Sequence, residues 1–588
     1  MALDPHPSRD YAVGPRLLLI TGLAVPIGAL GTVAAFVLLS LIRFFTNLFF
    51  FQTLSIEEHS PALNTLGLAV IVLPVLGGLI VGLMARYGSE KIRGHGIPEA
   101  IEAILFGKSR MSPKVAVLKP LSSGIVIGSG GPFGAEGPII MTGGAIGSLL
   151  GQLFHLSASE RKTLLVAGAT AGMTAVFGTP VAAVLLGVEL LLFELRPRSL
   201  LPVAIACAVA GFTRPLLLDA GRLFPLHTEA AGGAALVSCV VAGVLAGLLS
   251  AGLSRALYAT EDLFHRLPLH WMWWPALGGL AVGIGGWLEP RALGVGYDVI
   301  GDLLNHRLLI GTALALLGVK AVIWVIALGS GTSGGVLAPL LMIGAGLGTV
   351  LSAWLPGGDA SLWPLVCMAA VLAGVLGAPL TATVFAFGLT GDGNALLPLL
   401  LACAVSHGLS VLLMRRSIMT ERIARRGRHV YREYGVDPQE RVQVDEVMTR
   451  EVQTIPAATP LPVVAEHWFG AGQRHRAFAV VDEQDGFIGM LDRDGMGRAV
   501  GTARCAGDLV EAGEQLVALP DETCSRVAQR LAAHGLERLP VVADPVGRRL
   551  IGIVSRSDLV KPAKALYEEE GPREGMLRWP RRHRGASR

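Results

Sequence analysis

Long apolar segments separated by short polar loops follow one another from about Leu17 to Leu413. Each is close to the roughly 20 residues that a helix needs to cross the hydrocarbon of a bilayer, although several are shorter and are interrupted by glycine or proline. After Arg415 the pattern changes, because charged residues become dense and short alternating apolar runs appear. The pattern therefore predicts a multi-pass α-helical membrane protein with short, broken helices, followed by a soluble α/β module.

Composition strengthens this interpretation. Of the 588 residues, 52% are hydrophobic and 16% are charged, and the mean hydropathy of +0.57 is too high for an ordinary soluble multi-domain protein. The N-terminal segment is polar and no small-residue cleavage site follows it, so we expect no removable signal peptide and a cytoplasmic N-terminus. The net charge of +4 is spread over loops and tail, which favours basic cytoplasmic loops over a nucleic-acid surface.

The apolar region contains an internal repeat with an offset of about 200 residues. Three landmarks match between the two halves. Gly94-His-Gly96 matches Gly294-Val-Gly296, the glycine-rich segment that ends at Gly134 matches the one that ends at Gly335, and Gly178-Thr-Pro matches Gly377-Ala-Pro. Interrupted segments at matching places in two halves are typical of transporters whose site lies between the repeats. We expect repeats of about residues 17–224 and 234–413. Chance matches among the many glycines are the other interpretation.

The soluble module contains two similar units, each with a helix-period segment followed by alternating apolar strands. The strand pairs are expected at 477–481 with 486–491, and at 539–543 with 550–554. The predicted division of the chain is a cytoplasmic N-terminal segment 1–16, a membrane domain 17–416, a linker 417–441, soluble units 442–500 and 501–562, and a basic tail 563–588. The tail is expected to be disordered and to lie near anionic lipid.

Glycine-rich turns precede three of the apolar segments, at residues 94–98, 134–138 and 335–339. Glycine lets the backbone approach a ligand closely, and proline suits the first turn of a helix. Amides at several helix starts that converge on one desolvated point can hold chloride without a full positive charge. Glu136 lies within the second turn, and an ionisable group at membrane depth usually faces a cavity or an ion pathway. This carboxylate and an anion can therefore compete for one place.

These turns resemble the GSGIP, GREGP and GxFxP motifs of the CLC family of chloride channels and proton/chloride exchangers, and the resemblance extends from about Leu17 to Lys561. It implies two inverted repeats of tilted helices, a homodimer with one pathway per subunit, and a gating glutamate that maps onto Glu136. It also implies an integral protein of the cell (inner) membrane with both termini cytoplasmic, chloride as the bound ion and no required cofactor. The implied anion-binding residues are Gly94, His95, Gly96, Ile97, Pro98, Gly134, Ala135, Gly137, Pro138, Gly335, Val336, Leu337, Ala338 and Met419.

Four positions depart from the family pattern. His95 stands where most relatives have serine, and it is expected either to donate an N–H to the ion or to pack behind the pathway. Met419 stands at the place of the inner tyrosine, so the inner barrier is expected to be weaker and less polar. Leu337 replaces the phenylalanine of GxFxP, and Ala135 replaces the basic residue before the glutamate. Outside these motifs, Glu99 and Glu102 are expected to line a solvated helix start.

Proton-coupled relatives carry a second glutamate at the later of two adjacent acidic positions, and here that pair reads Glu189 and Leu190. Leu190 cannot carry a proton, so the resemblance favours a passive chloride channel. Glu189 is expected to be a structural buried acid or to serve a proton or ion. A proton-coupled antiporter remains the first alternative, because water or Glu194 can take the place of the missing second glutamate as the proton carrier. The sequence leaves open the voltage dependence and the preference among chloride, nitrate and fluoride.

The soluble units resemble paired CBS domains, the module named after cystathionine beta-synthase. In the second unit Ser555 and Asp558 match the usual ending, where a hydroxyl and a carboxylate bind the phosphate and ribose of a nucleotide; the first unit has Asp492 and Gly495 at these places. At most one adenine nucleotide site is therefore expected. An alternative of another class is a CBS-regulated magnesium transporter or nucleotide-sensing module. No nucleophile-base pairing or metal-ligand spacing supports an enzyme or a metal site.

Overall fold

The computed structural model describes residues 14–428, 430, 438–470, 472–473, 475–497, 503–510 and 515–564. These residues form two compact units, one extending to Val430 and the other beginning at Pro438. The predicted N-terminal segment, linker and basic tail each lie partly or largely outside the described residues, so those predictions remain untested.

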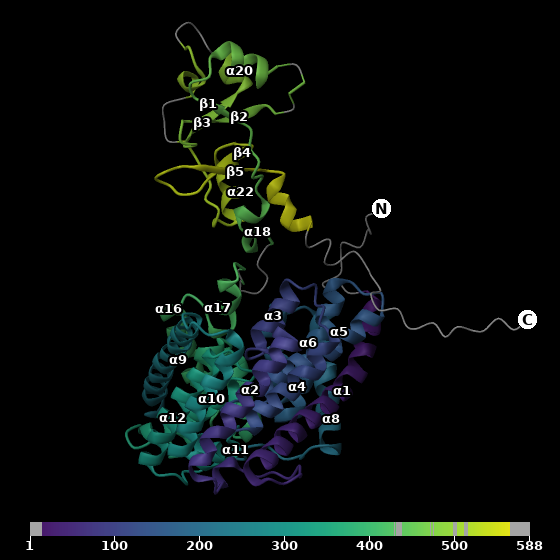
Figure 1. The fold of residues 1–588 in the computed structure, drawn as a ribbon, viewed down its shortest axis with the longest axis vertical. Helices are drawn as coiled ribbons and strands as arrows, with labels where there is room; N and C mark the ends of the chain where they lie inside the picture. Colours follow the sequence, from purple (N-terminus) through teal and green to yellow (C-terminus); the bar gives the residue numbers. More distant parts are fainter. Residues whose placement is uncertain are drawn as a thin grey trace, which may run out of the picture. The chain divides into compact units, whose positions relative to one another are not determined.

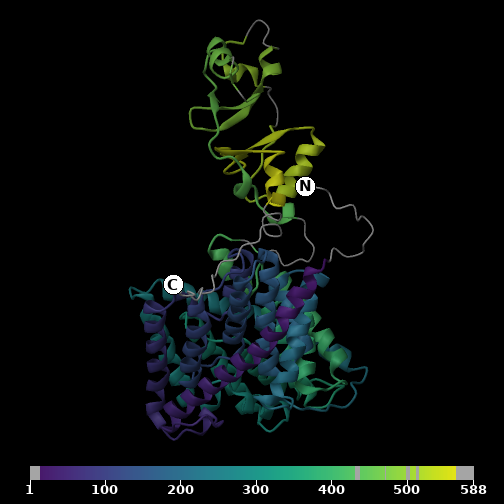
Figure 2. The same cartoon turned by 90° about the vertical axis from the view of Figure 1, so that its right-hand side faces the viewer.

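Helices make up the regular structure of the first unit in the part of the chain that is described (Figure 1). In order they are α1 (Arg16–Thr46), α2 (Val72–Tyr87), α3 (Ile97–Leu105), α4 (Pro113–Gly128), α5 (Glu136–Leu153), α6 (Ala158–Phe177), α7 (Pro180–Leu186), α8 (Pro197–Thr213), α9 (Ala235–His265), α10 (Trp274–Leu288), α11 (Tyr297–Leu304), α12 (Ile310–Gly329), α13 (Leu337–Leu351), α14 (Leu362–Leu376), α15 (Pro379–Thr390), α16 (Leu396–Leu413) and α17 (Ile418–Arg425). Figure 2 shows α1, the purple helix, crossing the unit at a slant.

Six helical segments among the described residues are long and apolar enough to cross a membrane: Arg16–Phe51, Gly67–Tyr87, Pro197–Leu216, Ala235–His265, Ile310–Gly329 and Leu396–Arg425. Others are apolar but short, such as α13 and α15. The short helices follow from their sequence. Gly178 and Gly377 end α6 and α14 in the left-handed conformation, and Pro180 and Pro379 then begin α7 and α15. The prediction of short, interrupted helices is confirmed.

The two halves contact each other reciprocally, as a two-fold relation requires. Gly78 of α2 lies against the carbonyl of Pro275, and Gly279 of α10 lies against the carbonyl of Pro74. Figure 1 places α3 at one end of the unit and its counterpart α11 at the other. The repeats are therefore inverted, as the family resemblance implies.

The centre of each half is one helix that is buried nearly all round. α14 is buried along its whole length, and α6 is buried from Thr163 onward. α6 packs against α1, α5 and α8, and α14 packs against the equivalent helices α9, α13 and α16. A helix that is apolar on every face must be enclosed by other helices. α6 and α14 therefore form the cores around which the two halves pack.

The second unit contains two small sheets. Its elements are α18 (Pro438–Arg441), α19 (Val444–Val447), β1 (Thr454–Pro456), α20 (Leu461–His467), β2 (Ala477–Val481), β3 (Phe487–Asp492), α21 (Arg493–Gly497), α22 (Cys524–Ala533), β4 (Arg538–Val542) and β5 (Leu550–Ser555). β2 pairs parallel with β1 and antiparallel with β3, and β4 pairs antiparallel with β5. The predicted strand pairs are present with bounds shifted by about one residue.

Candidate anion site

Three helices begin close together in the first unit: α3 after Gly96, α5 at Glu136 and α13 at Leu337. Gly96 has a φ of +94°, which glycine adopts without strain, and a Cβ there would lie 2.5 Å from the carbonyl oxygen of Gly137. A Cβ on Gly137 would in turn collide with the carbonyl oxygen of His95. Backbone therefore meets backbone where α3 and α5 begin, and this approach requires glycine.

The starts of α5 and α13 are hydrogen-bonded directly to each other. The Gly134 N–H donates to the Gly335 carbonyl at 3.3 Å, and the Gly335 N–H donates to the Gly134 carbonyl at 3.0 Å. Ala135 and Val336, which follow these glycines, are fully buried. The structure thus brings the three glycine turns together. The other motif residues buried in the first turns of these helices are Ile97, Pro98, Pro138 and Ala338.

Glu136 is the first residue of α5, and its side chain is fully buried. Its Oε1 accepts hydrogen bonds from the backbone N–H of Leu337 and, at 3.2 Å, from that of Ala338. Its Oε2 has no hydrogen-bond partner among the described residues. The amides at the start of a helix are a favourable place for an anion, and this carboxylate occupies them. The geometry therefore matches a competition between side chain and ion.

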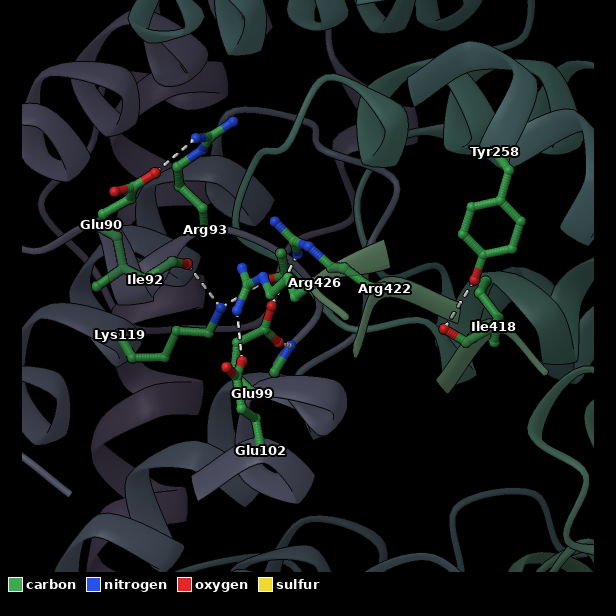
Figure 3. A network of polar contacts seen from close by, with 12 residues as sticks. Glu90, Ile92, Arg93, Glu99, Glu102, Lys119, Tyr258, Ile418, Arg422 and Arg426 are labelled. Carbon is green, nitrogen blue, oxygen red and sulfur yellow. Dashed lines mark hydrogen bonds and ion pairs between the residues drawn. The ribbon is translucent and has the colours of Figure 1, made fainter. Parts of the chain in front are cut away.

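Lys119 supports the turn at the start of α3. Its side chain on α4 is fully buried, and its Nζ donates to the carbonyls of Ile92 and Gly94 at 2.8 Å each (Figure 3). No motif in the sequence identifies this lysine. Its position does give a signal, because a single charged residue in an apolar segment usually has a structural or functional partner.

Glu99 corrects a prediction, because it does not lie at a solvated helix start. Its side chain is 10% exposed. One oxygen accepts the Gly96 N–H at 2.9 Å, and the other accepts Arg422 of α17 at 2.8 Å (Figure 3). The cause is the packing of α17 on α3, which also brings Arg426 to Glu102. The Gly96 amide is therefore occupied by protein, contrary to the expectation that it is open to an anion.

His95 and Met419 are both buried, with His95 4% exposed and Met419 fully enclosed. The His95 ring Nδ1 has no hydrogen-bond partner in the part of the chain that is described. Next to Met419, the hydroxyl of Tyr258 on α9 donates to the carbonyl of Ile418 at 3.0 Å. A tyrosine is therefore bonded to the residue before Met419, although it comes from a helix that the motifs do not identify.

Each acidic side chain considered for proton transfer has a partner. Glu189 lies in the π-helix Gly187–Leu192, and its Oε2 accepts the backbone N–H and the hydroxyl of Thr381 at 2.8 and 2.5 Å. Leu190 is fully buried. Glu194 accepts the Ser199 hydroxyl at 2.5 Å and lies 3.7 Å from the Lys162 ammonium. These contacts fit structural acids.

A cavity of about 520 Å³ opens at the end of the unit where α11 begins. Its lining includes Arg43, Arg214 and Arg222 as well as the start of α11 at Tyr297. The hydroxyl of Tyr297 has no hydrogen-bond partner among the residues described, and its ring lies edge-on to Phe177. The same lining holds the carboxylates of Glu58, Asp219 and Asp298, so the cavity carries no excess of positive charge.

The two soluble units differ at the predicted nucleotide positions. The Ser555 hydroxyl donates to Asp558 at 2.6 Å, and Lys561 lies 2.7 Å from the same carboxylate. In the first of the two soluble repeats, Asp492 accepts the N–H of Gly495 at 2.7 Å. The second soluble repeat thus retains the hydroxyl and the carboxylate side by side, although they hydrogen-bond to each other.

Comparison with known proteins agrees with this architecture. Residues 77–411 match the family model described as voltage gated chloride channel, and residues 444–499 and 514–563 match CBS domains. The chain is 33% identical over 365 residues to the voltage-gated ClC-type chloride channel ClcB of Salmonella dublin, covering 60% of this chain and 87% of that protein. It is 29% identical over 350 residues to a putative chloride channel protein ClcB-like of Ralstonia nicotianae, covering 58% and 82%.

Solved structures share the fold. A slow cyanobacterial Cl⁻/H⁺ antiporter has a TM-score of 0.61 at 22% identity, covering 71% of this chain and 99% of that one. A eukaryotic CLC transporter has a TM-score of 0.61 at 17% identity, covering 92% and 98%. With its family match, inverted repeats and converging helix starts, the chain belongs to the CLC family of voltage gated chloride channels and transporters and carries a C-terminal pair of CBS domains.

Proposed function

We propose that this protein conducts chloride passively through a CLC pathway that Glu136 closes and opens. The observation that carries the proposal is the hydrogen bonding of the Glu136 carboxylate to the amides at the start of α13. An anion with access to those amides would displace the side chain, and protonation would weaken its hold on them. Either event frees the place for chloride.

Leu190 supports a channel rather than a proton-coupled antiporter. A proton relay needs an ionisable group on the inner side, and this position carries a buried leucine. The neighbouring Glu189 is occupied by Thr381. The antiporter is kept as the second candidate because Glu194 is a carboxylate only a few residues further along the chain.

Around this gate we assign the remaining roles as parts of the same proposal. The amides at the start of α13 hold the anion where the three glycine turns meet, the ring Nδ1–H of His95 donates to it, and Met419 forms an apolar inner barrier. The protein works as a homodimer in the inner membrane with one pathway per subunit and both termini in the cytoplasm. Ser555 and Asp558 bind an adenine nucleotide. CLC membership leaves the magnesium transporter without support.

Reversal potentials of proteoliposomes separate the channel from the antiporter. The purified full chain is reconstituted with a chloride gradient and, in a second set, with an added pH gradient. A channel keeps the reversal potential at the value set by chloride alone in both sets. Movement of protons against their gradient, driven by chloride and abolished in Glu136→Ala, would instead establish the antiporter. Protein-free vesicles with a protonophore calibrate the proton leak.

A further inference from the structure

A second cavity of about 520 Å³ lies at the opposite end of the first unit from α11, between α3, the start of α4 and α17. Its volume is in the usual range for small-molecule sites. The basic side chains that line it are Lys91, Arg93, Arg110, Arg422, Arg426 and Arg428, and the acidic ones are Glu90, Glu99 and Glu102. Because basic side chains outnumber acidic ones by six to three, the lining has an excess of three positive charges.

The acidic side chains are shared among the arginines. Glu102 pairs with both Arg426 and Arg428, at 3.1 Å in the latter case, and Glu99 pairs with Arg422 at 2.8 Å. A guanidinium has five N–H donors, so one such pair leaves donors for a ligand. The side chains of Arg426 and Arg428 are 49% and 45% exposed, which leaves them accessible from solution.

The cavity is distinct from the place that Glu136 occupies, since Glu136 is not among its lining residues. Met141 lies next to both the cavity and the α3 turn. It lines the cavity, and its Cγ lies 3.1 Å from where a Cβ on Gly96 would be. The cavity therefore backs onto the α3 turn without reaching the start of α13.

We propose that this cavity binds a phosphate-bearing anion presented from the side on which α17 ends. Arginine forks from two elements, α17 and the turn before α3, face one space, and such forks match the paired oxygens of a phosphate. Chloride is a single sphere and gains little from a forked donor. The ligand chemistry is a terminal phosphate or a diphosphate, which a soluble metabolite and a phosphorylated lipid headgroup can both supply.

Binding is tested on the full chain in phosphatidylcholine nanodiscs, with inorganic pyrophosphate as the soluble probe and calorimetry as the readout. Arg426→Gln combined with Arg428→Gln is expected to weaken binding by about tenfold or more, because charge-assisted hydrogen bonds are lost. Both side chains are half-exposed, so the double variant should fold. The matched control is Arg266→Gln, an exposed arginine just beyond α9 that does not line the cavity.

A second arm identifies the source of the phosphate. Nanodiscs with and without a phosphatidylinositol phosphate are compared by thermal unfolding of the wild-type chain, the double variant and the Arg266→Gln control. Stabilisation by the lipid, or binding of pyrophosphate, that is lost in the double variant and kept in the control supports the site. Absence of both effects in the wild type, or equal effects in the double variant, overturns it. Neither readout depends on chloride transport, so failure here leaves the Glu136 gate untouched.

Discussion

The two halves of the membrane unit use the same backbone devices with different side-chain chemistry. Lys320 of α12 is fully buried and donates to the carbonyls of Ala292 and Gly294 at 2.9 and 2.8 Å, as Lys119 does in the first half. Each half therefore holds a glycine turn in place with one buried ammonium group. Since this arrangement occurs twice, it is part of the repeated fold rather than of one ion site.

The halves differ at the helix starts that meet. The first half supplies the carboxylate of Glu136, whereas the second supplies Leu337, whose backbone N–H donates to that carboxylate. One repeat thus provides a carboxylate and the other the backbone amides that bind it. Two positions that are equivalent in the repeats therefore carry different side chains, and the proposed gate depends on the one in the first half. The following variants test that comparison.

The largest effect is expected from Glu136→Ala. Without the carboxylate the α13 amides are open to chloride at every pH, so flux at neutral pH should rise by about tenfold or more and lose its dependence on acid. Chloride efflux from proteoliposomes between acid and neutral pH measures this. Leu337→Ala, at the equivalent position, is the matched control and should keep the acid dependence. Full acid dependence in Glu136→Ala would show that the gate is elsewhere.

A smaller difference is expected between Lys119→Met and Lys320→Met. Both variants leave two buried carbonyls without a donor, so both should lower the thermal unfolding midpoint in detergent. Only Lys119 lies beneath the turn that packs against the start of α5, so its loss should also weaken chloride affinity by about tenfold. Calorimetric titration with chloride compares them. Equal losses of affinity would mean that the two halves contribute alike to the ion site.

Arg422→Gln should weaken chloride affinity by only about threefold, through a charge effect transmitted by Glu99. The substitution leaves the Glu99 carboxylate unpaired next to the Gly96 turn, where it repels an anion. Adding Glu99→Gln removes that charge and should restore most of the affinity. Arg425→Gln, one turn along and paired with Asp262, is the control and should have no effect. If the double variant binds no better than Arg422→Gln, the Glu99 route is wrong.

The glycine turns were predictable because each is encoded by neighbouring residues, and their order identified the family and the fold. The contacts around them were not. Glu99 and Arg422 are 323 positions apart, and Tyr258 reaches Ile418 across 160. No local pattern indicates that α17 folds back onto α3, so the charge pairs there, and the burial of Glu99, required the structure. The roles of Glu136, His95 and Met419 in transport stay predictions.

The two CBS domains are also equivalent copies with different side chains, at Asp558 in the second and Asp492 in the first. Comparing Asp558→Asn with Asp492→Asn tests how much this difference contributes to stability. Burial alone would raise the pKa of Asp558, but hydrogen bonds from Lys561 and Ser555 outweigh it and hold the pKa below its usual range. An ionised Asp558 therefore stabilises the second CBS domain at neutral pH. This contribution is lost as the pH falls below about 4 and through the lowered pKa that Asp558 has in the folded state.

Asp558→Asn should accordingly lower the free energy of unfolding by about 1 kcal/mol at pH 7, with a difference that shrinks toward acid. Asp492 is exposed and accepts one backbone N–H, so Asp492→Asn should cost less than about 0.5 kcal/mol at either pH. Hydrogen exchange of β5 and β3 in the full chain reports each unit separately. Equal protection losses in the two variants would mean that the Ser555 and Asp558 contact contributes no more than an ordinary turn. A loss confined to β5 would show that the two CBS domains differ as the membrane halves do, with one copy retaining the paired hydroxyl and carboxylate.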